Sequence, residues 1–148
     1  MKYSVQIILL LFSLVSFSQT DPITKIAKAS TVSFVADNSG CFGGEIMEYK
    51  LVKKKNGDRS VTIVKQDGKI ETKKLSAKNY SAFISNFKTS YVKFKDPESV
   101  KQTCTSVSVF FLQDSKNKMS FSNVTCEADY NPEMFLQNLF RANDGQKK

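Results

Sequence analysis

The 148-residue sequence predicts an α+β fold, in which an antiparallel sheet of about five to six strands is covered by two amphipathic helices and preceded by a short N-terminal helix. Three observations predict it. Short alternating segments separated by Asn-Gly and Asp-Gly turns are typical of antiparallel hairpins. Two later segments repeat apolar residues with the period of an amphipathic helix. Asp21 followed by Pro22 indicates a helix start.

The first twenty residues have the pattern of an export signal. Lys2 precedes an apolar run over 7–17, and Ser16 and Ser18 supply small residues at the positions that signal peptidase reads. The run is shorter than the roughly 20 residues of a membrane-spanning helix. We expect a signal peptide over 1–18, cleavage after Ser18, and export to the periplasm or the medium. The alternative is an N-terminal helix that stays attached to the domain.

The mature chain is expected to form one domain over 19–142, followed by a disordered polar tail over 143–148. Its first helix is predicted over 22–29, and strands are predicted over 31–36 and 46–54. The residues predicted to face inward from the helix and the first strand are Ile23, Ile26, Ala27, Val32, Phe34 and Val35.

Two glycine turns predict a three-stranded meander. A two-residue turn at Asn56-Gly57 would set Lys55 opposite Asp58 and Tyr49 opposite Val64. A second turn at Asp67-Gly68 would pair segment 59–66 with 69–75. This register predicts one face with Met47, Tyr49, Leu51 and Val64, and another with Val52, Val61, Ile63 and Ile70.

Both amphipathic helices carry capping signals. Ser76 is predicted to cap the first, while Asn131 caps the closing helix and Pro132 opens it. An aromatic stripe on the first helix is compatible with a partner groove, but packing against the sheet accounts for it fully. The predicted buried residues are Tyr80, Phe83, Ile84, Phe87 and Tyr91 on the first helix, and Phe135, Leu136, Leu139 and Phe140 on the closing helix.

A C-terminal hairpin is predicted from segments 103–112 and 119–126. A turn over 114–116 with Gln113 opposite Asn117 would place Val109, Phe111, Met119 and Phe121 on one face. The same register sets Cys104 opposite Cys126, where Cβ atoms about 4.5 to 5.5 Å apart come close to disulfide reach. An oxidising compartment would allow this disulfide, which is expected to contribute on the order of 3 kcal/mol.

Cys41 is then the unpaired cysteine of three. It lies in the glycine-rich stretch Cys41, Phe42, Gly43 and Gly44, which we treat as a candidate free thiol or a turn site. The favoured interpretation is a small buried side chain in a turn between two strands. The alternative is a reactive or intermolecular thiol.

The absence of histidine excludes several catalytic arrangements. Ser-His-Asp and Cys-His sites, histidine-ligated zinc and the commonest neutral-pH general base all need this residue. The sequence also lacks Cys-x-x-Cys, phosphate-loop and Gly-x-Ser-x-Gly motifs. We therefore expect no catalytic residue, no cofactor and no metal site.

The net charge of +8 makes the chain strongly basic. Its lysine clusters are consistent either with a solvated face or with a surface that binds an anionic partner. They do not alternate with aromatic residues as in a base-stacking surface, so no specific nucleic acid is expected. The candidate basic surface consists of Lys53, Lys54, Lys55, Arg59, Lys73 and Lys74.

The stretch from Cys41 to Tyr49 resembles a group of small exported bacterial domains with the pattern Cys-Phe-Gly-x-Cys-Pro-x-Tyr. Cys41, Phe42 and Gly43 match the pattern. The second cysteine and the proline are absent, and the tyrosine is displaced by one residue. The resemblance implies a fold and an exported setting, but no activity.

We therefore expect a non-catalytic envelope or secreted module that is monomeric, has no membrane span and binds a protein or an anionic polymer. An inhibitor-like module could present the loop over 38–44 to its partner. The alternative is a secreted thiol- or carboxylate-based enzyme that uses Cys41.

Overall fold

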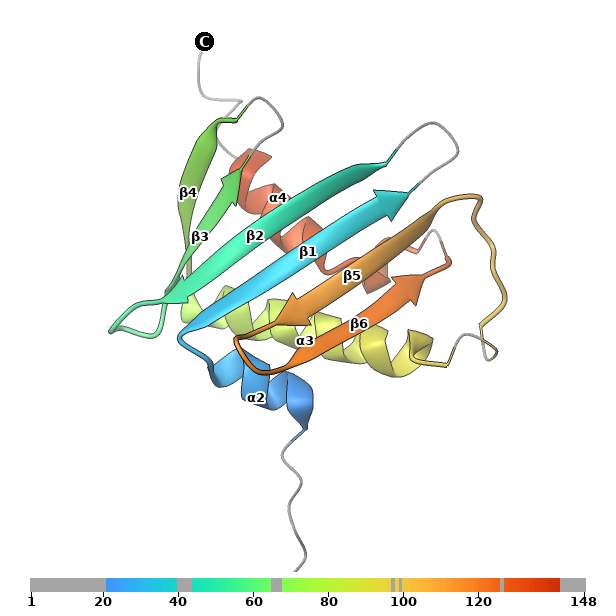
Figure 1. The fold of residues 1–148 in the computed structure, drawn as a ribbon, viewed down its shortest axis with the longest axis horizontal. Coiled ribbons are helices and arrows are strands. Elements are labelled where there is room, and N and C mark those ends of the chain that lie inside the picture. Colours follow the sequence, from blue (N-terminus) through green and yellow to red (C-terminus); the bar gives the residue numbers. More distant parts are fainter. Residues whose placement is uncertain are drawn as a thin grey trace, which may run out of the picture.

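The computed structural model describes residues 21–39, 44–64, 68–96, 98, 100–125 and 127–141. Six strands form one antiparallel sheet in the order β4-β3-β2-β1-β5-β6, which confirms the predicted α+β class (Figure 1). The signal peptide, its cleavage site and the polar tail lie outside the described residues. The strands are β1 (Thr31–Ser39), β2 (Glu45–Lys53), β3 (Arg59–Val64), β4 (Ile70–Leu75), β5 (Val107–Gln113) and β6 (Lys118–Asn123).

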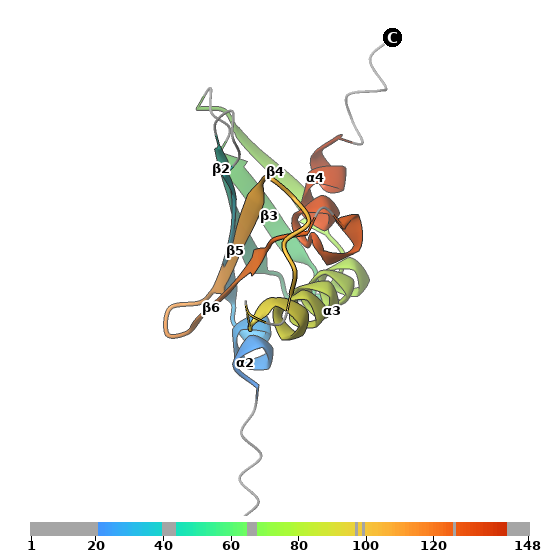
Figure 2. The ribbon, with the colours of Figure 1, turned by 90° about the vertical axis from the view of Figure 1, so that its right-hand side faces the viewer.

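The helices lie on one side of the sheet, as the side view in Figure 2 shows, with α2 at its lower end. Phe34 of β1 packs edge-on against Phe83 of α3, with their ring centroids 5.1 Å apart, and stacks on Phe110 of β5. The buried core therefore fills the space between the sheet and its helical layer. The helices are α2 (Pro22–Lys28), α3 (Ala77–Phe94) and α4 (Glu133–Arg141), with a short 3₁₀ turn η2 (Ala128–Tyr130) before α4.

The predicted helix caps are confirmed. The backbone N–H groups of Ile23 and Asn79 donate to the side chains of Asp21 (3.1 Å) and Ser76 (3.2 Å). The N–H of Glu133 likewise donates to the side chain of Asn131 at 3.0 Å. These short polar side chains satisfy backbone donors that a helix start leaves without an intrahelical partner.

Two predicted side-chain placements are wrong, one in β1 and one in α4. In β1, Ala36 rather than Val35 continues the buried alternation of Val32 and Phe34. In α4, Leu136 is buried as predicted, but Phe135 is 38% exposed. Phe135 therefore lies at the edge of the helix-to-sheet contact rather than inside it.

The predicted register of the β2–β3 hairpin is wrong by one residue. The N–H of Lys54 donates to the carbonyl of Asp58 at 2.8 Å, so the loop holds three residues and not two. Its third residue, Gly57, has φ +87°, the conformation that a three-residue hairpin loop needs at that position. Tyr49 therefore faces Ile63 and not Val64.

The β3–β4 pairing shifts in the same direction. Val64 faces Ile70, and Gly68 has φ +78°. A shift of one residue turns every side chain of a strand to the opposite face. Val61 and Ile63 consequently join Tyr49 in the core, while Val64 is 57% exposed on the uncovered face.

The β5–β6 register is also wrong by one residue, because its loop has two residues and not three. The N–H of Asp114 donates to the carbonyl of Asn117 at 3.0 Å, and the Asp114 carboxylate accepts from the N–H of Lys116 and Asn117. Phe110 therefore faces Phe121, and both are buried. Val109 and Phe111, which were predicted to share a face with Met119 and Phe121, lie on the opposite face of the sheet.

Candidate functional site

The sequence-predicted cysteine sites are only partly described. Cys41, Phe42, Gly43 and Cys126 lie outside the described residues, while Gly44 is exposed immediately before β2. The β5–β6 ladder begins with Ser108 opposite Asn123, so the register that placed Cys104 opposite Cys126 does not hold. A disulfide between these two cysteines stays a prediction.

Four chain segments meet at the end of the sheet where β2 and β4 finish. The N–H of Lys53 donates to the carbonyl of Ser30 at 2.8 Å, which ties the end of β2 to the residues after α2. Asp58, in the β2–β3 hairpin, accepts a hydrogen bond from the N–H of Ala77 at the start of α3 (3.1 Å). The Asp58 carboxylate also pairs with Lys74 of β4 at 2.7 Å. Figure 1 shows these segments at the lower left.

Exposed lysines surround this end of the molecule. Within residues 27–30, 53–59 and 73–78, the one carboxylate is Asp58, and Lys74 already pairs with it. Lys73, which the sequence also assigned to the surface, is only half-exposed. We call the following six exposed residues the basic end: Lys28, Lys53, Lys54, Lys55, Lys74 and Lys78.

Asp58 joins three of the segments that form the basic end. The hydrogen bond from Lys74, with further help from the N–H of Ala77 and the amide of Asn56, holds the pKa of Asp58 below its ordinary value of 3.8. Asp58 therefore stays ionised at neutral pH and fixes β4 and α3 against the hairpin that carries Lys53, Lys54 and Lys55.

Arg59 does not belong to the basic surface, contrary to the sequence-based assignment. Its side chain is 2% exposed, because the observed register turns it to the helix-covered face. Its guanidinium donates to the carbonyls of Ala27 (2.8 Å) and Ser30 (3.4 Å) and lies 4.1 Å from the centroid of the Tyr80 ring. Burial lowers the pKa of Arg59, but an arginine remains charged even so.

A second buried ionic side chain lies at the opposite end of β1, and sequence reasoning missed it. Glu133, the first residue of α4, is 1% exposed. It accepts hydrogen bonds from the Tyr49 hydroxyl (3.0 Å) and the Asn38 amide (3.1 Å). Burial, and then the nearby Glu133 carboxylate, raise the pKa of the Tyr49 hydroxyl, which therefore remains a donor.

The buried carboxylates of Glu133 and Asp58 already have partners within the protein. Within the described part of the chain, no group of three or more cysteine, aspartate or glutamate side chains is placed to hold a metal ion. Glu133 is engaged by two protein donors, and Asp58 by a lysine and a helix start. Apart from Lys74, the lysines of the basic end are exposed and form no ion pair with another described residue.

Neither family models nor curated proteins give a match to this chain. In the portion of the chain that the structure describes, no helix is both long and apolar enough to cross a membrane.

Proposed function

We propose that the chain is an exported, non-catalytic binding module that holds an anionic polymer at its basic end. One observation carries this proposal: six exposed lysines share the basic end with a single carboxylate, which Lys74 neutralises. Such an excess of one charge creates a local potential that attracts partners of the opposite charge.

The spacing of the lysines favours a polymer over a small anion. They project from four segments, namely the end of α2, the β2–β3 hairpin, β4 and the start of α3. Lysine ammonium groups act as mobile point charges and not as a rigid fork for one phosphate or carboxylate. A chain of repeated negative groups can engage several of them at once, and the summed attraction weakens as salt screens it.

Heparin is a suitable anionic probe, with neutral dextran as the comparison polymer. We expect the mature domain to bind immobilised heparin at low ionic strength, to elute as salt rises, and not to bind dextran. The double variant Lys54→Gln/Lys55→Gln should bind heparin about fivefold more weakly, since each exposed charge pair contributes up to about 1 kcal/mol.

A control of equal charge change separates a localised site from net charge alone. Lys95 and Lys101 are also exposed, but they lie at and beyond the other end of α3. Lys95→Gln/Lys101→Gln should therefore retain nearly all heparin affinity. Equal weakening by the two double variants would refute a localised basic end, and absence of heparin binding at low salt would refute the function.

A further inference from the structure

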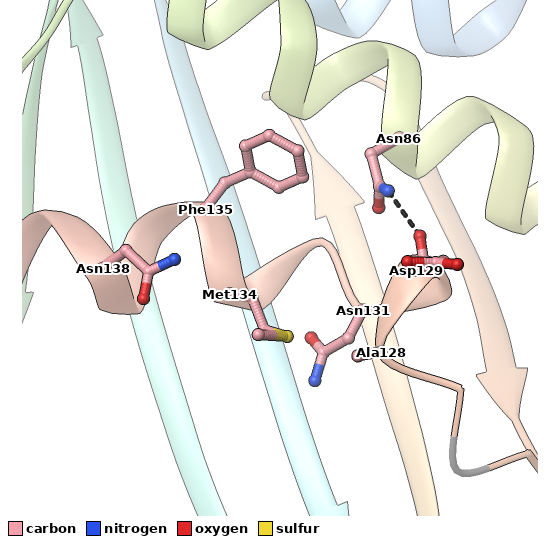
Figure 3. A pocket seen from close by; sticks show the side chains of 7 residues that line it. All are labelled: Asn86, Ala128, Asp129, Asn131, Met134, Phe135 and Asn138. Carbon is pink, nitrogen blue, oxygen red and sulfur yellow. Dashed lines mark hydrogen bonds between the residues drawn. The ribbon is translucent and has the colours of Figure 1, made fainter.

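A hollow of about 290 Å³ lies between α3, η2 and α4, away from the basic end. Figure 3 shows the side chains of Asn86, Asn131 and Asn138 arranged around Met134 and Phe135. These three asparagines come from α3, from the short segment between η2 and α4, and from α4 itself. The hollow therefore combines amide groups from separate elements with an apolar wall.

The apolar wall of the hollow, formed by Met134 and Phe135, is partly exposed to solvent. Met134 and Phe135 are 39% and 38% exposed at the start of α4, whereas Leu136 beside them is fully buried. The aromatic ring of Phe135 and the thioether of Met134 both line the hollow and offer polarisable contacts for the apolar face of a small ligand.

The amide groups leave hydrogen-bonding capacity unused. Asn86 donates through Nδ2 to the carbonyl of Asp129 at 2.7 Å, but its Oδ1 is shielded from solvent and has no partner among the described residues. Asn131 uses its Oδ1 to cap Glu133, which leaves its Nδ2 group as a donor. Asn138 is exposed, and no hydrogen bond to another described residue engages its amide. Asn131 and Asn138 therefore supply the amide groups that a ligand in the hollow could engage.

We propose that this hollow binds a neutral sugar residue. The C–H face of the ring would pack on Phe135 and contact Met134, while its hydroxyl groups would accept from the amide groups of Asn131 and Asn138 and donate to Oδ1 of Asn138. A hydroxyl both donates and accepts, as these amides do. Asp129 is the one ionisable residue of the lining, so the hollow is not suited to an anionic ligand. Small-molecule sites typically combine such an apolar wall with a few polar groups.

The test uses N-acetylglucosamine and glucose as probes of the ¹⁵N-labelled protein. We expect N-acetylglucosamine, glucose or both to shift the side-chain amide signals of Asn86, Asn131 and Asn138 in a saturable manner. Phe135→Ala and Asn138→Ala should each weaken this binding at least fivefold. Both positions are exposed, and the fold should tolerate the changes.

Two matched controls complete the experiment. Asn79→Ala replaces an exposed asparagine at the other end of α3 and should leave sugar affinity unchanged. The Lys54→Gln/Lys55→Gln variant should do the same, so failure of the sugar site and failure of heparin binding can be told apart. Absence of saturable shifts with both sugars, or equal affinity in Asn79→Ala and Asn138→Ala, would overturn the proposal. Saturable binding of N-acetylated dipeptides in place of sugars would overturn it too.

Discussion

The two ends of β1 each hold a buried ionic side chain, and the two are satisfied in opposite ways. Arg59 meets carbonyl groups at the end of α2, whereas Glu133 is itself the first residue of α4. A helix presents partial negative charge at its C-terminus and partial positive charge at its N-terminus. Each buried ion therefore lies at the helix end of opposite polarity and attaches that helix to the sheet.

Glu133 and Arg59 also differ in the number of elements they contact and in how completely they are hydrogen-bonded. Glu133 receives hydrogen bonds on both carboxylate oxygens from side chains of β1 and β2. Arg59 joins β3 to the end of α2 and to the Tyr80 ring of α3, and no partner for its Nε is present among the described residues. Arg59 therefore connects more elements, while Glu133 has the more complete set of hydrogen bonds.

The largest effect is expected from Arg59→Met. This change leaves the carbonyl of Ala27 with one donor fewer, removes the cation from the Tyr80 ring and frees the end of α2. We expect a loss of about 3 kcal/mol in the free energy of unfolding, measured by urea denaturation. Arg141→Met alters an exposed arginine of α4 and should cost less than about 0.5 kcal/mol. Equal stability of the two variants would contradict an anchoring role for Arg59.

A smaller loss is expected at the other end of β1. Glu133→Ala would leave the buried Tyr49 hydroxyl and the Asn38 amide without their acceptor, at a cost of about 2 kcal/mol. Glu133→Gln keeps one acceptor oxygen and should cost about half as much. Glu98→Ala, at an exposed position, serves as the control. If urea denaturation showed Glu133→Gln to be less stable than Glu133→Ala, the loss of the acceptor oxygens would not explain the cost. The donor group that glutamine places against Tyr49 or Asn38 would then explain it.

The sequence permitted prediction of the helices but not of the burial of Arg59 and Glu133. Asp21, Ser76 and Asn131 act locally, since a cap needs only the backbone a few residues away, and all three caps were predicted. The turn containing Gly57 is compatible with a two-residue or a three-residue loop, and the alternation of the flanking strands did not decide between them. The wrong choice turned Arg59 to the wrong face.

The burial of Glu133 could not be predicted from the sequence for a different reason. A glutamate in the first turn of a helix is ordinarily solvated, and its burial depends on Tyr49 and Asn38, which are 84 and 95 residues away. The hollow beside α4 likewise requires three asparagines from separate elements. Contacts of this kind follow from tertiary packing and leave no periodic signal in the sequence.

The smallest effect concerns acid stability at the Arg59 end, where Asp58 neighbours the anchor in sequence. Because folding lowers the pKa of Asp58 below 3.8, the unfolded chain binds the proton first as the pH falls. The stabilisation is therefore complete above the ordinary pKa and is lost as the pH falls through the folded-state value. Asp58→Asn should make stability less dependent on pH in this acidic range, as measured by urea denaturation at successive pH values.

The matched pair for this prediction is Lys74→Gln and Lys78→Gln. Lys74 pairs with Asp58 at 2.7 Å, whereas Lys78 is an exposed lysine four residues further along the chain. Removing Lys74 takes away the largest cause of the shift, so the pKa of Asp58, followed by NMR titration of its carboxyl group, should rise towards 3.8. Removing Lys78 should move it much less. An equal rise in both variants would mean that Asp58 responds to the general positive charge of the basic end, and the local ion pair would then have no special part in holding β4 and α3 beside Arg59.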